Sequence, residues 1–275
     1  MVKTLLQELE LIMDIPNSKS KTDLDWADGS EILGEKLELF LPENKKYLDP
    51  FLEASGSTGP AKWFFIDTNK IYSKYSFDDI AVRDVAYNRP TKDAKKLIDK
   101  DFGGNRKLAF ETVNMIHDYV KTGAHYVLVV IVSDKVHAFV SFEKPHHSVS
   151  YSVETAISTG GAVKLHDIYA DLIKQEDIII TTSSQSEGGI NLWMRLSKVP
   201  GIVVHGWDKK NSKPINLGPS FTDPEETHVS PSDIYGSAAL DREHEGEAGA
   251  EELEDLKHIH RSVILVASKK KKRKK

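Results

Sequence analysis

The sequence contains no cysteine, so it cannot form disulfide bonds, use a catalytic thiolate or build a zinc site with cysteine ligands. It also lacks long apolar runs. The longest, over residues 126–132, has the length of a strand, whereas a membrane-spanning helix needs about 20 residues. We therefore expect no contact with a membrane. Glu8 and Glu10 interrupt the apolar residues near the N-terminus, so we expect no signal peptide and, by default, a cytoplasmic location.

The charge is distributed in two opposed blocks. The net charge of the 275 residues is −5, but Lys269–Lys275 contains only basic residues, seven in all, so the remainder carries −12 (−5 − 7). Eight acidic residues lie between Asp241 and Asp255. Because an acidic body repels phosphates, contact with nucleic acid or with an acidic partner would have to come from Lys269–Lys275. The tail could equally improve solubility, or pair with the acidic segment.

Hydrophobic residues make up 39% of the chain and charged residues 29%, which is typical of a folded core. The patterns predict a mixed α/β protein with a mainly antiparallel sheet flanked by helices, a flexible acidic insertion and a basic C-terminal tail. We expect an antiparallel meander over 126–132, 136–142 and 149–157, a helix from Leu165, a strand over 177–182, a helix capped by Ser186, and strands over 202–205, 215–217 and 262–267.

The first hundred residues carry weaker signals. Residues 2–14 are predicted as an amphipathic helix, 53–60 as a loop and 63–67 as a strand, and a further helix is predicted over 107–121. The loop bears a faint likeness to a phosphate loop but lacks the Gly-Lys-Ser/Thr ending. The predicted organisation is an N-terminal region over 1–60, a core over 61–217, an acidic linker over 218–261, and a C-terminal strand and tail over 262–275.

Two common site types are not expected. Among the eleven histidines, His146 and His147 are adjacent and would point to opposite faces of a strand, and no His-Glu-x-x-His pattern occurs, so no metal site is predicted. No Gly-x-Ser-x-Gly elbow holds a nucleophilic serine.

The junction between the third meander strand and the following helix is the strongest candidate site. Ile157-Ser158-Thr159-Gly160-Gly161-Ala162 provides small residues just before the helix, where unpaired backbone N–H groups can hold a phosphate. An ordinary glycine turn is the alternative.

The order of elements over residues 107–217 resembles that of the GCN5-related N-acetyltransferase (GNAT) family. Its loop pattern, Gln/Arg-x-x-Gly-x-Gly/Ala, is matched at Gly160 and Ala162, whereas Ile157 replaces the Gln/Arg. A second run resembles the family's next helix, with Ser for Asn and Trp for Tyr; its residues are Ser186, Gly189, Ile190, Leu192, Trp193 and Leu196. The Gly-Gly-x-x-Leu-Trp-x-x-Leu pattern is also similar to uncharacterised phage proteins of this type, which would place the chain in a host cytoplasm or a virion.

This resemblance implies an acyltransferase that uses acetyl-CoA on an unknown amine. Glu154 would be the general base. Trp193 cannot donate a proton as the family's Tyr does, so Tyr169, or Tyr151 if the geometry allows, would be the acid. The implied cofactor-binding residues are Val153, Thr155, Thr159, Gly160, Gly161, Ala162, Ser186 and Trp193.

Two alternatives remain open at this point. Glu154 could be an ordinary surface glutamate, and the domain could be a non-catalytic binding or virion-associated protein that uses its basic tail. The family's fold requires the two parallel strands, here expected at 151–157 and 178–182, to splay apart and admit the cofactor. A closed gap would favour the binding protein.

Overall fold

The computed structural model divides the chain into two compact units. Unit 1 comprises Met1–Ser20, Lys144–Val153 and Lys164–Lys275, and unit 2 comprises Lys21–Glu143 and Glu154–Val163. The structure describes residues 32–120, 125–144, 150–159, 164–182, 187–208, 212–215 and 263–271.

Unit 2 is built on an antiparallel array of four strands in chain order. These are β1 (Leu52–Thr58), β2 (Ala61–Asp67), β3 (Tyr126–Val132) and β4 (Lys135–Glu143). The continuous apolar run of β3 is buried from Val127 to Ile131, as expected for a central strand.

Tight connections join these strands and tie the next one to them. Ser133 and Asp134 link β3 to β4 with φ of 50° and 62°, which matches the two-residue turn of a hairpin. The second half of β5 (Ser150–Ser158) also belongs to this unit, and Thr159 N donates to the carbonyl of His137 on β4 at 2.9 Å.

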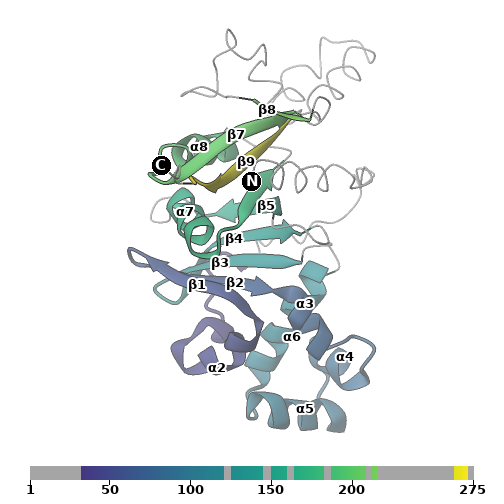
Figure 1. The fold of residues 1–275 in the computed structure, drawn as a ribbon. Coiled ribbons are helices and arrows are strands. Elements are labelled where there is room, and N and C mark those ends of the chain that lie inside the picture. The colour runs from purple at the N-terminus through teal and green to yellow at the C-terminus, as the bar shows by residue number, and fades with distance from the viewer. Residues whose placement is uncertain are drawn as a thin grey trace, which may run out of the picture. The chain divides into compact units, whose positions relative to one another are not determined.

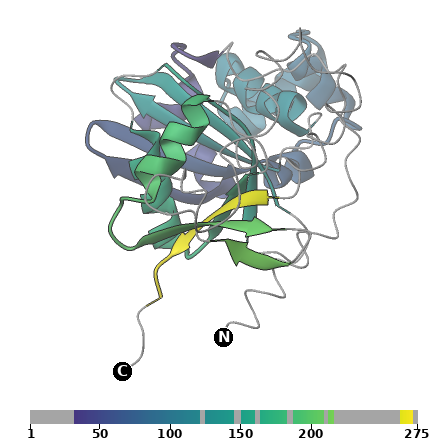
Figure 2. The same ribbon diagram turned by 90° about the horizontal axis from the view of Figure 1, so that it is seen from above.

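Helices cover one face of these four strands (Figures 1 and 2). Short turns η2 (Glu38–Phe40), η3 (Pro42–Asn44), α2 (Lys45–Leu48) and η4 (Asp49–Phe51) precede β1, and four longer helices separate β2 from β3. The longer helices are α3 (Thr68–Lys74), α4 (Ile80–Ala86), α5 (Lys92–Phe102) and α6 (Arg106–Val120).

Side-chain caps start three of these helices. Asp67, Asp79 and Thr91 each accept a hydrogen bond from a backbone N–H of the first turn, and Gly103 ends α5 in the left-handed conformation at φ 60°. The helices share a buried core with the strand residues Ile66, Val127, Val129, Ile131, Val136 and Phe139.

Unit 1 contains the single parallel strand pair among the described residues. The first half of β5 pairs in parallel with β6 (Ile179–Thr182). Next to β6 lies β9 (Val263–Lys269), which pairs antiparallel with β6 and with β7 (Ile202–Asp208); β8 (Lys213–Ile215) completes the order. Figure 2 shows β9 in yellow beside β7 and β8.

Two helices pack on these strands. In α7 (Leu165–Glu176) the core side chains recur at helical spacing, with Ile168, Tyr169, Leu172 and Ile173 all buried. The second helix, α8 (Glu187–Leu196), contacts α7 and β7, and its Trp193 and Leu196 are buried.

The predicted fold class, a mixed and mainly antiparallel α/β protein flanked by helices, is confirmed. The strands over 63–67, 126–132 and 136–142, the third meander strand, the helix over 107–121 and the final strand are also confirmed, each within a few residues. The predicted loop over 53–60 is wrong, because residues 52–58 form strand β1. This also removes the faint likeness to a phosphate loop.

Other sequence predictions have different outcomes. The domain boundaries predicted at 60 and 217 stay a prediction; in the structure β1 pairs with β2, and β9 lies between β6 and β7. The helices α3, α4 and α5 were not predicted. The predicted helix over 2–14 and the acidic linker over 218–261 lie outside the described residues, as does most of the basic tail.

Candidate functional site

The parallel pairing of β5 with β6 covers only the start of β5. The paired residues are Ser150 with Ile179, Tyr151 with Ile180 and Ser152 with Thr181, whereas β5 continues to Ser158. The register with β6 therefore ends one residue before Val153. Because β6 itself ends at Thr182, the described residues leave the predicted separation of the two strands a prediction.

Glu154 lies two residues beyond the last paired residue and belongs to unit 2. Surrounding protein atoms desolvate its carboxyl group and, together with the neighbouring negative charge of Glu143, raise the pKa of Glu154 to about 7. The residue as a whole is exposed, so water screens part of both effects. A carboxylate with a raised pKa is suited to accept a proton near neutral pH.

The residues that alternate with Glu154 face the other side of β5. Val153, Thr155 and Ile157 are half-buried, and Ile157 packs against the hydrophobic core of unit 2. This contact gives a physical reason for the apolar residue at the position where the family's loop pattern has Gln/Arg: here the side chain contributes to the core.

The sequence reasoning missed a contact between Thr159, at the end of β5, and His137 on β4. The hydroxyl of Thr159 lies 3.0 Å from Nδ1 of His137, and its backbone N–H donates to the His137 carbonyl. The register of β3 with β4 shifts between Val130 and Ile131, which places His137 at a β-bulge. These contacts fix Thr159, the residue immediately before Gly160. No sequence pattern relates His137 to Thr159, so this contact needed the structure.

The predicted acid, Tyr169, is in unit 1 and is only 1% exposed. Burial raises the pKa of its hydroxyl group, which keeps the proton on the oxygen at neutral pH and makes the group a weak acid. Tyr151, the alternative, is also buried, and its hydroxyl oxygen accepts a hydrogen bond from Nζ of Lys144 at 2.9 Å. Trp193 is 3% exposed and forms part of the packing of α8.

The remaining predicted cofactor residues, Gly160, Gly161, Ala162 and Ser186, lie outside the described residues. The first described residue after the glycines is Lys164, the N-cap of α7, and its side chain makes no capping hydrogen bond. Within the described part of the chain, no group of three histidine or carboxylate side chains is arranged to hold a metal ion. The described helices are each too short or too polar to cross a membrane.

Comparison with known proteins gives little. No family model and no curated protein matches the chain. Among solved structures, the chain is similar in part to an aminoglycoside 6′-acetyltransferase type Ii, with 9% identity and a TM-score of 0.24, over 40% of this chain and 76% of that chain. A likeness this weak supports no conclusion about fold or activity.

Proposed function

We propose that the chain is a GNAT-like acyltransferase that uses an acyl-CoA, with acetyl-CoA as the first candidate, to acylate an amine. The observation that carries the proposal is the position of Glu154. It stands just past the point where the β5–β6 register ends, and its pKa is raised to about 7.

Several features of the residues present are compatible with an acyl-CoA. Among the described residues, β5 pairs with β6 only from Ser150 to Ser152, and in this proposal the backbone of β5 from Val153 onward binds a ligand's amide and carbonyl groups. Thr159 is held by His137 at the start of the small-residue segment, and the side chain of Lys164, the N-cap of α7, makes no capping hydrogen bond. When bound, acyl-CoA supplies an acyl group activated as a thioester.

The proposed role of Glu154 follows from its protonation. An amine is mostly an ammonium ion at neutral pH and cannot attack a carbonyl until it loses a proton. The Glu154 carboxylate accepts that proton and holds it at the carboxyl oxygen, while the backbone near Val153 orients the acyl carbonyl. Because the pKa of Glu154 is close to neutral, the group is available as a base and its basicity is higher than that of an ordinary glutamate.

The acid is a separate part of the proposal. Tyr169 is the predicted donor of the proton that the departing thiolate receives, but its raised pKa makes it a weaker acid than an ordinary tyrosine. Its burial in the core of unit 1 limits access to it, so Glu154 is the residue on which the proposal rests.

Calorimetric titration of the full chain with acetyl-CoA and with CoA tests the binding step. We expect saturable binding with a Kd below about 1 mM. No heat of binding with either ligand at millimolar concentration would rule out the enzymatic proposal.

Turnover can be followed by the release of free thiol, with a panel of small amines and lysine-containing peptides as acceptors. The chain has no cysteine, so a thiol reagent detects only the CoA that is released. Glu154→Gln should lower kcat by about 100-fold or more and leave the KM for acetyl-CoA unchanged. Glu35→Gln, an exposed glutamate in the same unit, is the matched control. An equal rate in Glu154→Gln and wild type would exclude Glu154 as the base.

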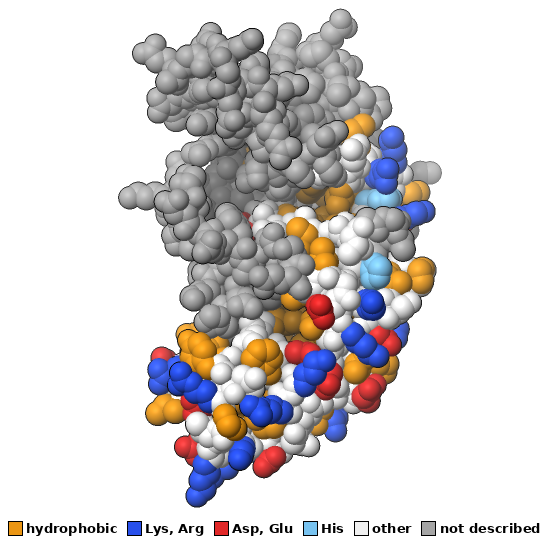
Figure 3. All heavy atoms as spheres, turned by 180° about the vertical axis from the view of Figure 1, so that it is seen from behind, with side chains coloured by type: hydrophobic (Ala, Val, Ile, Leu, Met, Phe, Trp, Pro, Cys, Tyr) orange, Lys and Arg blue, Asp and Glu red, His pale blue; other side chains and the backbone are white. Residues whose placement is uncertain are grey.

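A second candidate function is favoured by the basic C-terminal end. On the coloured part of Figure 3, lysine and arginine side chains alternate with acidic ones, which is a poor surface for nucleic acid. Lys270 and Lys271, by contrast, are exposed immediately after β9 ends at Lys269. We propose, as the alternative, a non-catalytic protein that contacts nucleic acid through this tail.

The structure shows which basic residues of the tail can be replaced in a test without disturbing the sheet. Lys269 is paired in the sheet and its Nζ donates to the carbonyl of Lys174 at 3.0 Å, while Lys270 N donates to the carbonyl of Gly201. Replacing the basic residues 271–275 with serine leaves these contacts intact. The change should weaken binding to a labelled oligonucleotide and reduce the slope of log affinity against log salt by roughly 3 to 4. An unchanged slope would contradict the alternative.

A further inference from the structure

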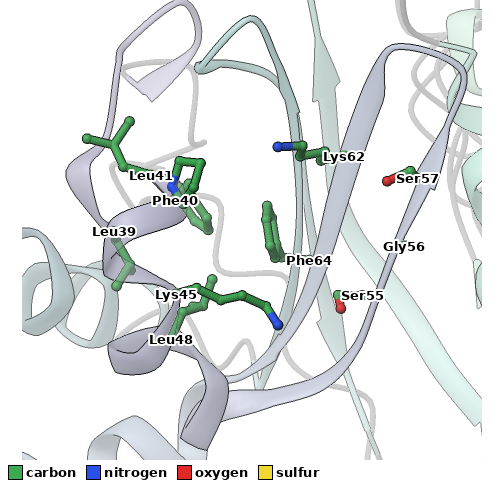
Figure 4. Close-up of a pocket in the computed structure, with 11 residues that line it drawn as sticks. Leu39, Phe40, Leu41, Lys45, Leu48, Ser55, Gly56, Ser57, Lys62 and Phe64 are labelled. Atoms are coloured by element: carbon green, nitrogen blue, oxygen red, sulfur yellow. The ribbon is translucent and has the colours of Figure 1, made fainter.

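Unit 2 contains a pocket that has no part in the proposed acyl transfer. It has a volume of about 280 Å³ and lies between the β1–β2 hairpin and the short turns from η2 to α2 (Figure 4). Its lining residues are Leu39, Phe40, Leu41, Pro42, Lys45, Leu48, Ser55, Gly56, Ser57, Lys62 and Phe64.

The hairpin contributes one face of the pocket through strand alternation. Ser55 pairs with Phe64 and Ser57 pairs with Lys62, so all four side chains lie on the same side of the hairpin. Gly56 and its partner Trp63 belong to the opposite side, and only the backbone of Gly56 lines the pocket.

The deep wall of the pocket is apolar. Leu39, Phe40 and Leu48 are nearly fully buried, and the rings of Phe40 and Phe64 are 5.4 Å apart. A volume of 280 Å³ accommodates roughly nine water-sized groups. That space fits a short alkyl chain or a single ring.

The rim of the pocket is basic. In Figure 4 the ammonium groups of Lys62 and Lys45 lie on opposite sides of the Phe64 ring, and the hydroxyl groups of Ser55 and Ser57 lie along β1. None of the lining residues is acidic. Lys45 forms an ion pair with Asp49 at 3.6 Å, in which both side chains are largely exposed, so the pair holds Lys45 only weakly.

The wall is held in place without a ligand. The carboxylate of Glu111 accepts a hydrogen bond from Leu39 N at 3.1 Å, and Asn105 and Asn44 donate to the side chain and the backbone carbonyl of Glu38 at 2.7 and 2.9 Å. A pre-formed wall lowers the entropic cost of binding a small molecule.

We propose that this pocket binds an amphipathic carboxylate, with its apolar part against Phe40, Leu48 and Phe64 and its anionic group at the rim near Lys45 and Lys62. The apolar wall alone would accept any small hydrophobe. The two lysines and the absence of acidic lining residues select a negative charge, and they disfavour an amine of the same size.

Octanoate is a suitable probe because its size matches the pocket. Titration of the full chain, followed by ligand-observed NMR and calorimetry, should give saturable binding with a Kd of about 1 mM or tighter. Octylammonium and acetate are the control ligands. Octylammonium keeps the alkyl chain but carries a positive charge, and acetate keeps the carboxylate but lacks the long alkyl chain. Both should bind at least about tenfold more weakly than octanoate.

Four variants locate the binding. Lys45→Gln and Lys62→Gln should each weaken octanoate binding about three- to tenfold, and Lys95→Gln, an exposed lysine on α5, should not change it. Ser55 is exposed on a strand, so Ser55→Phe should leave the melting temperature near that of wild type while its ring fills the pocket and abolishes binding.

The proposal would be overturned by no saturable binding of octanoate at 10-fold the expected Kd, by equal binding of octylammonium or acetate, or by undiminished binding in both lysine variants. Unchanged binding in a folded Ser55→Phe variant would place the ligand elsewhere and would overturn it as well. None of these variants touches Glu154, so the outcome is independent of the acyl-transfer proposal.

Discussion

A Cβ atom on Gly56 would lie well inside van der Waals contact of Cζ2 of Trp63, the residue opposite it in the β1–β2 pair. The indole ring therefore occupies the space that any other side chain at position 56 would need. Trp63 is 0% exposed, so its ring has no solvent into which it can swing. The absence of a side chain at Gly56 is thus a packing requirement of β1 and explains how a strand can contain this glycine.

Gly56→Ala should destabilise the protein by about 1 to 3 kcal/mol, because the added methyl group overpacks the contact with Trp63. Urea unfolding followed by tryptophan fluorescence measures this change. Gly59→Ala is a poor control because its φ is +59° and adds backbone strain, so Ser57→Ala, in the same strand, is preferred. The Ser57→Ala variant should change the free energy of unfolding by less than about 0.5 kcal/mol.

A double-mutant cycle tests the cause. If the ring of Trp63 is the obstacle, Trp63→Leu should reduce the cost of Gly56→Ala, giving a coupling of about 0.5 kcal/mol or more. Additive effects of the two changes would show that the alanine is destabilising for a different reason.

This glycine also shows where sequence reasoning fails. The strand β3 was predictable because it is apolar throughout, whereas β1 reads Leu-Glu-Ala-Ser-Gly-Ser-Thr and resembles a loop. Its strand structure depends on pairing with β2 and on the indole that covers Gly56, and both are tertiary effects. Helices α4 and α5 did carry readable start signals at Asp79 and Thr91, and these were overlooked.

Sequence reasoning also failed where interacting segments lie far apart along the chain. The final strand was predicted, but its place between β6 and β7 was not, because β9 follows β8 only after a long stretch of chain and nothing local specifies its partners. The candidate base, Glu154, was identified from the sequence. The neighbouring charge of Glu143 and the contact of His137 with Thr159 needed the structure.

Glu111 on α6 fixes the pocket wall and provides a second prediction. Its side chain is 9% exposed and accepts a hydrogen bond from the N–H of Leu39, which is itself fully buried. Glu111→Ala leaves that N–H without its acceptor and should cost about 1 to 3 kcal/mol of stability. Glu111→Gln keeps a carbonyl oxygen at the same place and is the matched control.

The pKa of Glu111 determines the direction expected for the control. Burial raises the pKa of this carboxyl group above its usual value, so the folded state binds its proton more tightly than the unfolded state. The resulting stabilisation is fully present at pH values below the pKa of Glu111 in the unfolded state. It is lost as the pH rises through the pKa of Glu111 in the folded state. At pH 7 to 8, Glu111→Gln removes this loss and should be at least as stable as wild type. A destabilisation equal to that of Glu111→Ala would show that the charge itself holds Leu39.

Glu154 and Glu143 give a prediction that needs no substrate. The pKa of Glu154 is raised to about 7, so wild type should lose stability relative to Glu154→Gln as the pH rises from about 4.5 through 7, and the difference should level off above pH 8. Urea unfolding at half-unit pH intervals measures the difference. Glu35→Gln should show no such rise with pH.

Glu143→Gln separates the two causes of this shift. Removing the neighbouring negative charge leaves desolvation alone, so the pKa of Glu154 should fall toward its ordinary value without reaching it. The pH range of the stability loss should therefore move to lower pH in Glu143→Gln. If Glu154 is also the base for acyl transfer, the acidic limb of the kcat profile should move in the same direction, because the carboxylate forms at lower pH. A shift in stability without a shift in the rate profile would leave Glu154 as a surface residue with a raised pKa and assign the proton transfer to another group.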